Sequence, residues 1–372
     1  MDTNNKLNEI AMVFFKMGSI AFGGPAAHIA MMEDEIVKKR KWITSEHFLD
    51  LMGATNLIPG PNSTEMTMHC GHERAGWKGL FVAGICFVFP AVIMTMVLAW
   101  AYQKYGQLPD IQPFIYGIKP AVIAIIVAAV YKLGKKALKN KVLAILGIST
   151  FAACLLGVHE IIALFSCGLL GLSWYLLTNS KRTLNSFSPL VFFHITEPEN
   201  TLKILLIFLK VGALLYGGGY VLFAFLDAEL VSTGLLSRQE LMDAVAVGQF
   251  TPGPVLSTAT FIGWQLGGFW GSMAATIGIF LPSFIFVLIL NPIIPKLRKS
   301  KSISTFLDCI NIAAVAVILA VCVDMGKDTL TDWRTLAITV LSLIIVFGYK
   351  KMNSALLVIG GSLGGYGLSF IG

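Results

Sequence analysis

Two short segments of this apolar chain place a glycine between two prolines, in "NLIPGPNSTEM" and in "QFTPGPVLSTA". Proline removes a backbone donor and clashes with the preceding helical turn, so neither segment can continue a helix. The helix that follows each break begins with free N–H groups and a partial positive charge, which attract anions. The predicted break residues are Pro59, Gly60, Pro61, Pro252, Gly253 and Pro254, and the predicted oxyanion ligands are Asn62, Ser63, Thr64, Ser257 and Thr258.

Two lysines, Lys16 and Lys210, lie within apolar segments, and a pair of glycines follows each of them. A lysine inside a membrane span is costly without a partner, so both are predicted to bind the anion together with the helix ends. The alternative for Lys16 is that its long side chain reaches the membrane surface. The glycine pairs, predicted either to break the helix or to allow close packing, are Gly23, Gly24, Gly217 and Gly218.

A set of acidic and histidine residues follows the first break, and Glu65, His69 and His72 share one helical face. This spacing is compatible with metal ligands, so an intramembrane metal-dependent hydrolase is the alternative function. The sequence lacks the second histidine of an HExxH motif, which weakens that interpretation. In a transporter, Glu65 and His69 are the candidates for proton coupling.

The composition is that of a polytopic membrane protein rather than of a soluble enzyme. Of 372 residues, 56% are hydrophobic and 13% charged, with a mean hydropathy of +0.75. The net charge of +7 is attributed to cytoplasmic loops and not to nucleic-acid binding, and the six scattered cysteines indicate neither disulfides nor zinc. No cofactor or metal is expected. Helical spans of about 20 residues are predicted near 11–32, 79–102, 114–131, 142–157, 160–178, 203–226, 270–291, 305–323, 333–348 and 354–371.

The chain is an internal duplication, because "KMGSIAFGGPAAHIAMMEDEIV" matches "KVGALLYGGGYVLFAFLDAELV" and both Pro-Gly-Pro segments follow at nearly the same offset. The predicted units are residues 1–179, a cytoplasmic linker over 180–202, and residues 203–372. With about five crossings and one re-entrant Pro-Gly-Pro hairpin per half, most loop lysines and arginines fall on one side. The predicted fold is therefore an all-α inverted-topology repeat with both termini outside.

The motifs "FGGPAAHIAMMEDEIV", "NLIPGPNSTEMTMHCGHERAGWKGLFVAGICFVFPA" and "FTPGPVLSTATFIGWQLGG" resemble the chromate ion transporter family, in particular its members with two fused halves. Tyr216 replaces the phenylalanine of the family's Phe-Gly-Gly segment, and Asn56 stands where the second half has Gln249. The resemblance implies a bacterial inner-membrane protein that exports chromate and confers chromate resistance, with sulfate as a competing oxyanion. A homodimer is left open.

Overall fold

The computed structural model describes residues 3–22, 24–55, 57–106, 108–179, 200–216, 219–290, 300–349 and 353–370. These residues form helices joined by short connections, with no strand among them, which confirms the all-α prediction. The linker over 180–202 lies almost wholly outside the described residues, as do Gly23, Gly217 and Gly218.

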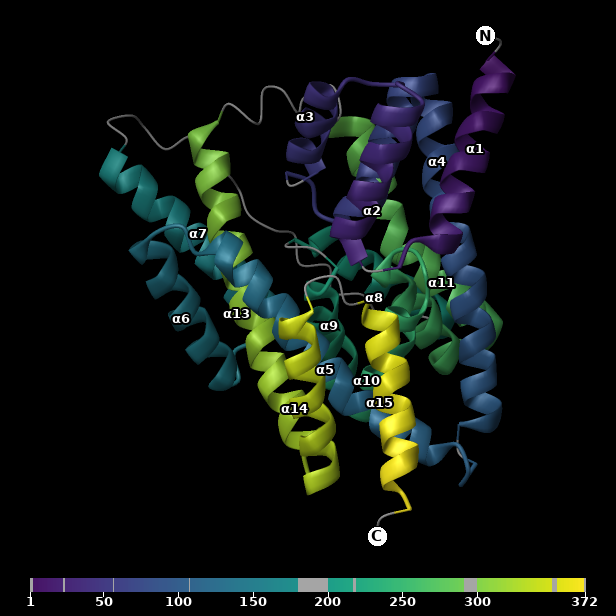
Figure 1. Ribbon diagram of the computed structural model, residues 1–372. Helices are drawn as coiled ribbons and strands as arrows, with labels where there is room; N and C mark the ends of the chain where they lie inside the picture. The colour runs from purple at the N-terminus through teal and green to yellow at the C-terminus, as the bar shows by residue number, and fades with distance from the viewer. Residues whose placement is uncertain are drawn as a thin grey trace.

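The Pro-Gly-Pro break divides the first half into two groups of helices (Figure 1). Before the break lie α1 (Thr3–Ile20), α2 (Gly24–Met32), the π-helical turn η1 (Glu33–Lys39) and α3 (Ser45–Thr55). After it lie α4 (Asn62–Tyr105), α5 (Gln112–Ala137), α6 (Lys141–Leu155) and α7 (Glu160–Asn179).

The second half repeats this order of elements. Before its break lie α8 (Asn200–Leu214), α9 (Val221–Leu226), the π-helical turn η2 (Asp227–Val231) and α10 (Arg238–Phe250). After it lie the 3₁₀ turn η3 (Val255–Ser257), α11 (Thr258–Leu290), α13 (Lys301–Thr329), α14 (Trp333–Gly348) and α15 (Ser354–Leu368).

Helix length and apolarity identify which elements can cross a membrane. Within the described residues, five helical segments are long and apolar enough, namely Asn62–Tyr105, Gln112–Ala137, Glu160–Thr178, Val255–Ile289 and Lys301–Thr329. Helices α6, α14 and α15 are shorter apolar helices. The multi-pass character expected from composition is therefore present, but the predicted spans at 11–32 and 203–226 are absent from this set.

The first of those two predicted spans was wrong because the chain reverses inside it. Helix α1 ends at Ile20, and α2 begins at Gly24, which has a φ of +76° that only glycine adopts readily. Glu9, near the start of α1, forms ion pairs with Arg40 at 2.7 Å and with Arg74 at 2.8 Å. The N-terminal end of α1 therefore lies on the same side as the basic loop 38–41, whereas the prediction placed them on opposite sides.

The second half breaks at the equivalent place. Helix α8 ends at Leu214 and α9 begins at Val221, so the segment 203–226 is also two helices. Lys210 on α8 is 2.6 Å from Glu229 on η2, which shows that these elements run back alongside each other. Each half thus contains a broken helical pair in addition to its Pro-Gly-Pro break, one more than was predicted.

Helices α4 and α11 are sharply folded near one end. Ala75 and Gly76 leave the helical conformation in α4, and Gly267 and Gly268 do so at the equivalent place in α11. Gly76 and Gly268 have φ values of +62° and +59° with ψ near −150°, a region that is essentially restricted to glycine. Helices α4 and α11 therefore each consist of two segments. A short segment lies next to the Pro-Gly-Pro break, and a long segment beyond the fold can cross the membrane.

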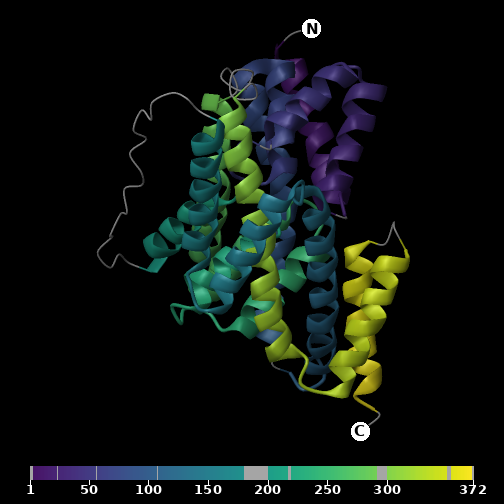
Figure 2. The same cartoon turned by 90° about the vertical axis from the view of Figure 1, so that its left-hand side faces the viewer.

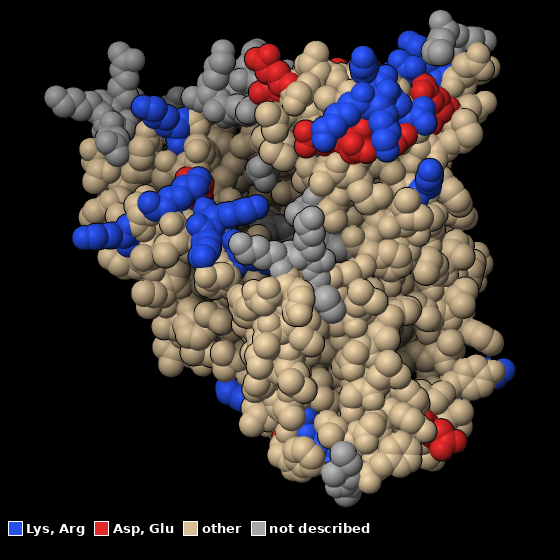
Figure 3. Space-filling view, in the orientation of Figure 1, with Lys and Arg blue, Asp and Glu red and all other residues tan. Residues whose placement is uncertain are grey.

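The first helices of the two halves lie at different levels of the molecule, whereas the long helices of both halves pack alongside one another (Figures 1 and 2). Helices α1 to α3 lie in the upper part, α10 and α15 lie lower, and the N- and C-termini lie at opposite ends. Ten full crossings would place both termini on one side, so this separation differs from the prediction. In Figure 3, lysine and arginine side chains gather over the upper part of the face shown, and the lower part is mostly uncharged.

Candidate functional site

The two Pro-Gly-Pro breaks meet the ends of α1 and α8 through reciprocal backbone hydrogen bonds. The Gly60 N–H donates to the Leu215 carbonyl at 2.7 Å, and the Gly253 N–H donates to the Ala21 carbonyl at 2.9 Å. Ala21 and Leu215 occupy equivalent positions, each directly before the aromatic residue of the Phe-Gly-Gly or Tyr-Gly-Gly segment. Each break is thus satisfied by the opposite half, as irregular backbone at membrane depth requires.

A helix begins after each break, as predicted from the sequence, but its first residue lies one position later than predicted. Pro61 and Pro254 are N-cap residues with extended backbone, rather than first helical residues. The Pro61 carbonyl accepts hydrogen bonds from the Thr64 and Glu65 N–H groups, while the Pro254 carbonyl accepts one from Ser257. The first turns of both helices therefore start within the molecule, on either side of the boundary between the halves.

The predicted oxyanion ligands lie at these starts. Thr64, Ser63, Ser257 and Thr258 are all buried, and Asn62 is partly buried. The Thr64 hydroxyl has no hydrogen-bond partner among the residues that the structure describes, whereas the Thr258 hydroxyl donates to the Val255 carbonyl at 2.8 Å. The Thr64 hydroxyl after the first break is therefore an available buried donor. The Thr258 hydroxyl after the second break is already used in a hydrogen bond within its own turn.

Gly60 and Gly253 have no room for a side chain. Both have positive φ, +144° and +92° respectively. A Cβ at Gly60 would overlap the Ser283 hydroxyl and the Glu65 carboxyl, and a Cβ at Gly253 would come within 2.9 Å of Ala91 Cβ. Ser283 and Ala91 each follow the proline inside the long helix of their own half, so the two breaks contact matching positions of opposite halves.

Glu65 is the buried acid of this region. It is fully buried in the first turn of α4, and Thr258 occupies the matching position of the second half. His69 is also fully buried one turn further along α4. His28, a further candidate ligand of the metal alternative, is buried on α2 with Nε2 3.0 Å from the Ala21 carbonyl that also accepts from Gly253. Among the described residues, Glu65, His69 and His28 are the acid and the histidines of this centre, and all three belong to the first half.

The predicted lysine ligands lie elsewhere. Lys16 and Lys210 are exposed, and Lys210 is paired with Glu229, whose carboxylate also lies 3.9 Å from His159 Nε2. A lysine neutralised by a carboxylate at the surface offers little net charge to an anion. Neither lysine is thus among the buried groups at the helix starts, and the structure describes a partner for Lys210 in Glu229.

The metal-dependent hydrolase finds no support in the structure. In the part of the chain that is described, no group of three or more histidine, cysteine, aspartate or glutamate side chains lies close enough to hold a metal ion. His72 is only partly buried, unlike Glu65 and His69.

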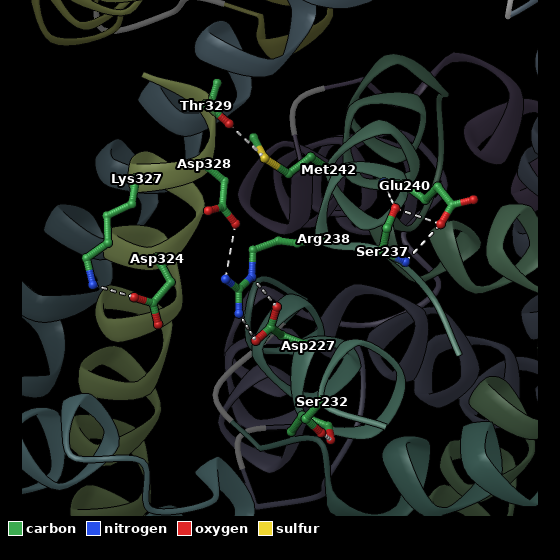
Figure 4. A network of polar contacts seen from close by, with 11 residues as sticks. Asp227, Ser232, Ser237, Arg238, Glu240, Met242, Asp324, Lys327, Asp328 and Thr329 are labelled. Carbon is green, nitrogen blue, oxygen red and sulfur yellow. Dashed lines mark hydrogen bonds and ion pairs between the residues drawn. The ribbon is translucent and has the colours of Figure 1, made fainter. Parts of the chain in front are cut away.

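A polar network joins the start of α10 to η2 and to the end of α13 (Figure 4). Arg238 donates from Nε to Asp227 at 3.0 Å and from Nη1 to Asp328 at 3.1 Å. The Asp227 carboxylate beside Arg238 raises the pKa of the guanidinium. Ser237 and Glu240 form a capping box that fixes the start of α10. These contacts anchor the helix that leads into the second Pro-Gly-Pro break.

Sequence reasoning missed a second buried charge. Lys119 on α5 forms an ion pair with Asp243 on α10 at 3.4 Å, and the Tyr102 hydroxyl at the end of α4 donates to Asp243 at 2.6 Å. Asp243 borders a cavity of about 310 Å³ that extends along α10 to Phe250. The available signal was Lys119 itself, a lysine within the apolar run "GIKPAVIAIIV".

The family model described as "Chromate transporter" matches this chain twice, over residues 8–172 and 202–366. The chain is 30% identical over 378 residues to the "Probable chromate transport protein" of Synechococcus elongatus, covering 96% of this chain and 95% of the relative. It is also 30% identical over 368 residues to the "Chromate transport protein" of Cupriavidus metallidurans, covering 96% and 92%.

A shorter relative corresponds to one half only. The "Uncharacterized transporter YwrA" of Bacillus subtilis is 26% identical over 164 residues, which is 43% of this chain and 92% of that protein. No solved structure matches the chain. The double match and the full-length relatives lead to one conclusion: this chain is a member of the chromate transporter family, with two copies of the family unit in one polypeptide.

Proposed function

We propose that this protein is a secondary transporter that exports chromate across the bacterial inner membrane by alternating access and so confers chromate resistance. The observation that carries the proposal is the reciprocal bonding of Gly60 to Leu215 and of Gly253 to Ala21. It couples two broken helices from opposite halves, an arrangement that secondary transporters use to build a substrate site at the repeat interface.

The substrate site is assigned to the starts of α4 and α11. The helix dipole supplies partial positive charge there, and the side chains of Asn62, Ser63, Thr64, Ser257 and Thr258 supply polar contacts. The unpartnered Thr64 hydroxyl is the donor that a bound oxyanion would satisfy. Sulfate has the same tetrahedral shape and charge as chromate, so it is expected to compete.

The membrane potential favours export. Moving a dianion out of a cell that is negative inside releases about 4.6 kcal/mol per 100 mV, because each charge contributes about 2.3 kcal/mol. That free energy sustains a concentration ratio of more than about 1,000-fold. Export therefore needs no second ion, whereas concentrative uptake would need one.

Glu65 and His69 remain the proposed groups if protons are exchanged. Glu65 is fully buried beside Gly60, and a charged carboxylate there would oppose an anion at the start of α4. In proteoliposomes, Glu65→Gln is expected to retain potential-driven chromate transport and to lose any response to an imposed pH gradient. A normal pH response in Glu65→Gln would remove Glu65 from the proposal.

The decisive experiment is uptake of radiolabelled chromate into inverted membrane vesicles that contain the protein, with and without a positive-inside potential. Accumulation that requires the potential and is suppressed by excess sulfate is the expected result. Vesicles without the protein are the control. Failure to accumulate chromate under any gradient would overturn the assigned substrate and direction.

A further inference from the structure

The strongest unassigned feature is the buried ion pair between the two halves. Lys119 and Tyr102 belong to the first half and Asp243 to the second, and the exposed fractions of the Lys119 and Asp243 side chains are 18% and 6%. Charged side chains at membrane depth are costly and mark ion pathways by default. A purely structural contact between apolar helices would not need a lysine and an aspartate.

The pair is loosely held. Lys119 Nζ lies 3.4 Å from Asp243 Oδ1, which is longer than the 2.7–2.9 Å of a well-formed charge-assisted hydrogen bond. Asp243 Oδ2 accepts the shorter bond, from the Tyr102 hydroxyl at 2.6 Å, and Oδ1 is the atom that faces Lys119. The Tyr102 hydroxyl therefore fixes the position of the Asp243 carboxylate. The carboxylate balances the charge of Lys119, but its distance leaves the ammonium group able to donate hydrogen bonds to another anion.

The pair lies at one end of a path toward the second break. The cavity of about 310 Å³ borders Tyr102 and Asp243 and extends past Val247 to Phe250, two residues before Pro252. Seven residues of helix separate Asp243 from Phe250, which is about 10 Å. Apart from Tyr102, Asp243 and Ser362 the described lining is apolar and includes no lysine or arginine. Lys119 reaches this cavity through its ion pair with Asp243.

We propose that Lys119 is an oxyanion-binding residue on the transport path, and that Asp243 is the resident counter-ion which the dianionic substrate displaces. This inference rests on the proposed export of chromate. A chromate or sulfate dianion that leaves the helix starts would exchange with the carboxylate at Lys119, and Tyr102 would hold the displaced carboxylate. Asn311 occupies the position equivalent to Lys119 in the second half, so the site exists once per chain.

The test measures equilibrium binding of radiolabelled chromate to the purified protein and chromate counterflow in proteoliposomes. Lys119→Gln is expected to weaken binding about tenfold or more, since it removes a poorly solvated positive charge. Lys119→Arg should preserve binding. Asp243→Asn should bind chromate about tenfold more tightly and exchange it more slowly, because the competing carboxylate is gone. The double variant should bind as weakly as Lys119→Gln.

The matched control is a second lysine–aspartate pair that also joins the halves but is exposed. Lys139 lies 2.7 Å from Asp308, and the exposed fractions of their side chains are 57% and 27%. Lys139→Gln and Asp308→Asn should bind and exchange chromate as the wild type does. A melting temperature for each variant separates loss of fold from loss of site.

The outcomes discriminate clearly. Wild-type chromate affinity in both Lys119→Gln and the double variant would overturn the inference while the transport function stands. A second result would also overturn the inference. If Lys119→Gln and Asp243→Asn weaken chromate binding equally and the double variant restores normal exchange, the ion pair only stabilises the contact between the halves. Absence of chromate counterflow in the wild type would instead overturn the proposed function, and this inference with it.

Discussion

At the scale of single residues, three features of the structure require glycine at position 60. Its φ of +144° favours glycine, its N–H bonds the other half, and a Cβ would overlap Ser283 and Glu65. Gly60→Ala is therefore expected to cost about 1–3 kcal/mol of stability from backbone strain, with a further loss from the overlap, and to abolish chromate counterflow. Thermal melting in detergent and counterflow assays measure the two effects.

The control for Gly60→Ala is Gly326→Ala. Gly326 lies within α13 at an ordinary φ, and a Cβ there would have no neighbour within 4 Å. Because alanine favours a helix more than glycine does, this variant should be neutral or slightly more stable. If Gly60→Ala melts and transports as Gly326→Ala does, the break does not depend on Gly60.

The residue scale also shows what sequence reasoning can and cannot supply. The burial of Ser63, Thr64, Ser257 and Thr258 followed from the prolines before them, because a helix restarts at a fixed distance from such a break. The exposure of Lys16 did not follow, because an apolar flank does not reveal which face of a helix turns outward. Lys119 was missed for the related reason that its partner, Asp243, lies 124 residues away.

At the scale of elements, the folds in α4 and α11 depend on one glycine each. Gly76 and Gly268 have positive φ, and a Cβ at either would have no neighbour within 4 Å. The cost of Gly76→Ala or Gly268→Ala is therefore purely conformational, about 1–3 kcal/mol each. Both variants should lower the melting temperature by similar amounts, and unchanged melting of either would show that the helix can straighten there.

The turn η1 offers a prediction about pH. The Arg40 guanidinium beside Glu35 lowers the pKa of that carboxyl below its ordinary value of 4.5. A depressed pKa stabilises the folded state above pH 4.5, and the stabilisation is lost as the pH falls through the folded value. Glu35→Gln should cost about 0.2–1 kcal/mol at pH 7, because the pair is partly exposed, and the difference from wild type should shrink below pH 4.5.

Melting of both proteins in detergent between about pH 2.5 and pH 8 checks this prediction, because the range must extend below the lowered pKa of Glu35. Asp110→Asn, in the exposed connection before α5, is the control for removal of a carboxylate. A stability difference between Glu35→Gln and wild type that stays constant across this range would assign the effect to packing rather than to charge.

The long helices were predicted correctly from the sequence and the broken helical pairs were not, for a physical reason. The long apolar helices were found because periodicity and length are local properties. The segments 11–32 and 203–226 were read as single spans because a Gly-Gly pair is compatible with close helix packing as well as with a break. The ion pair between Glu9 and Arg40 decides between these alternatives. It cannot be predicted from a local sequence pattern, because the two residues are far apart in the sequence.

At the scale of the whole molecule, the remaining proposal is that the second half is inverted relative to the first. The reciprocal bonds at Gly60 and Gly253 require that each half presents the same surface to the other. The start of α3 lies in the upper part of the molecule and α10 lies lower (Figure 1). An inverted pair of repeats would produce both features, and it would place matched loops on opposite sides of the membrane.

Matched cysteines test the inversion directly. Glu46 in α3 and Gln239 in α10 occupy equivalent positions, and both are exposed. In a variant lacking the six native cysteines, Glu46→Cys should react with a membrane-impermeant maleimide only in inverted vesicles, because it lies beside the basic loop 38–41 that the positive-inside rule places in the cytoplasm. Gln239→Cys should react only in right-side-out cells. Reaction of both cysteines from the same side would mean parallel halves, and the reciprocal contacts at the breaks would then need an explanation other than an inverted repeat.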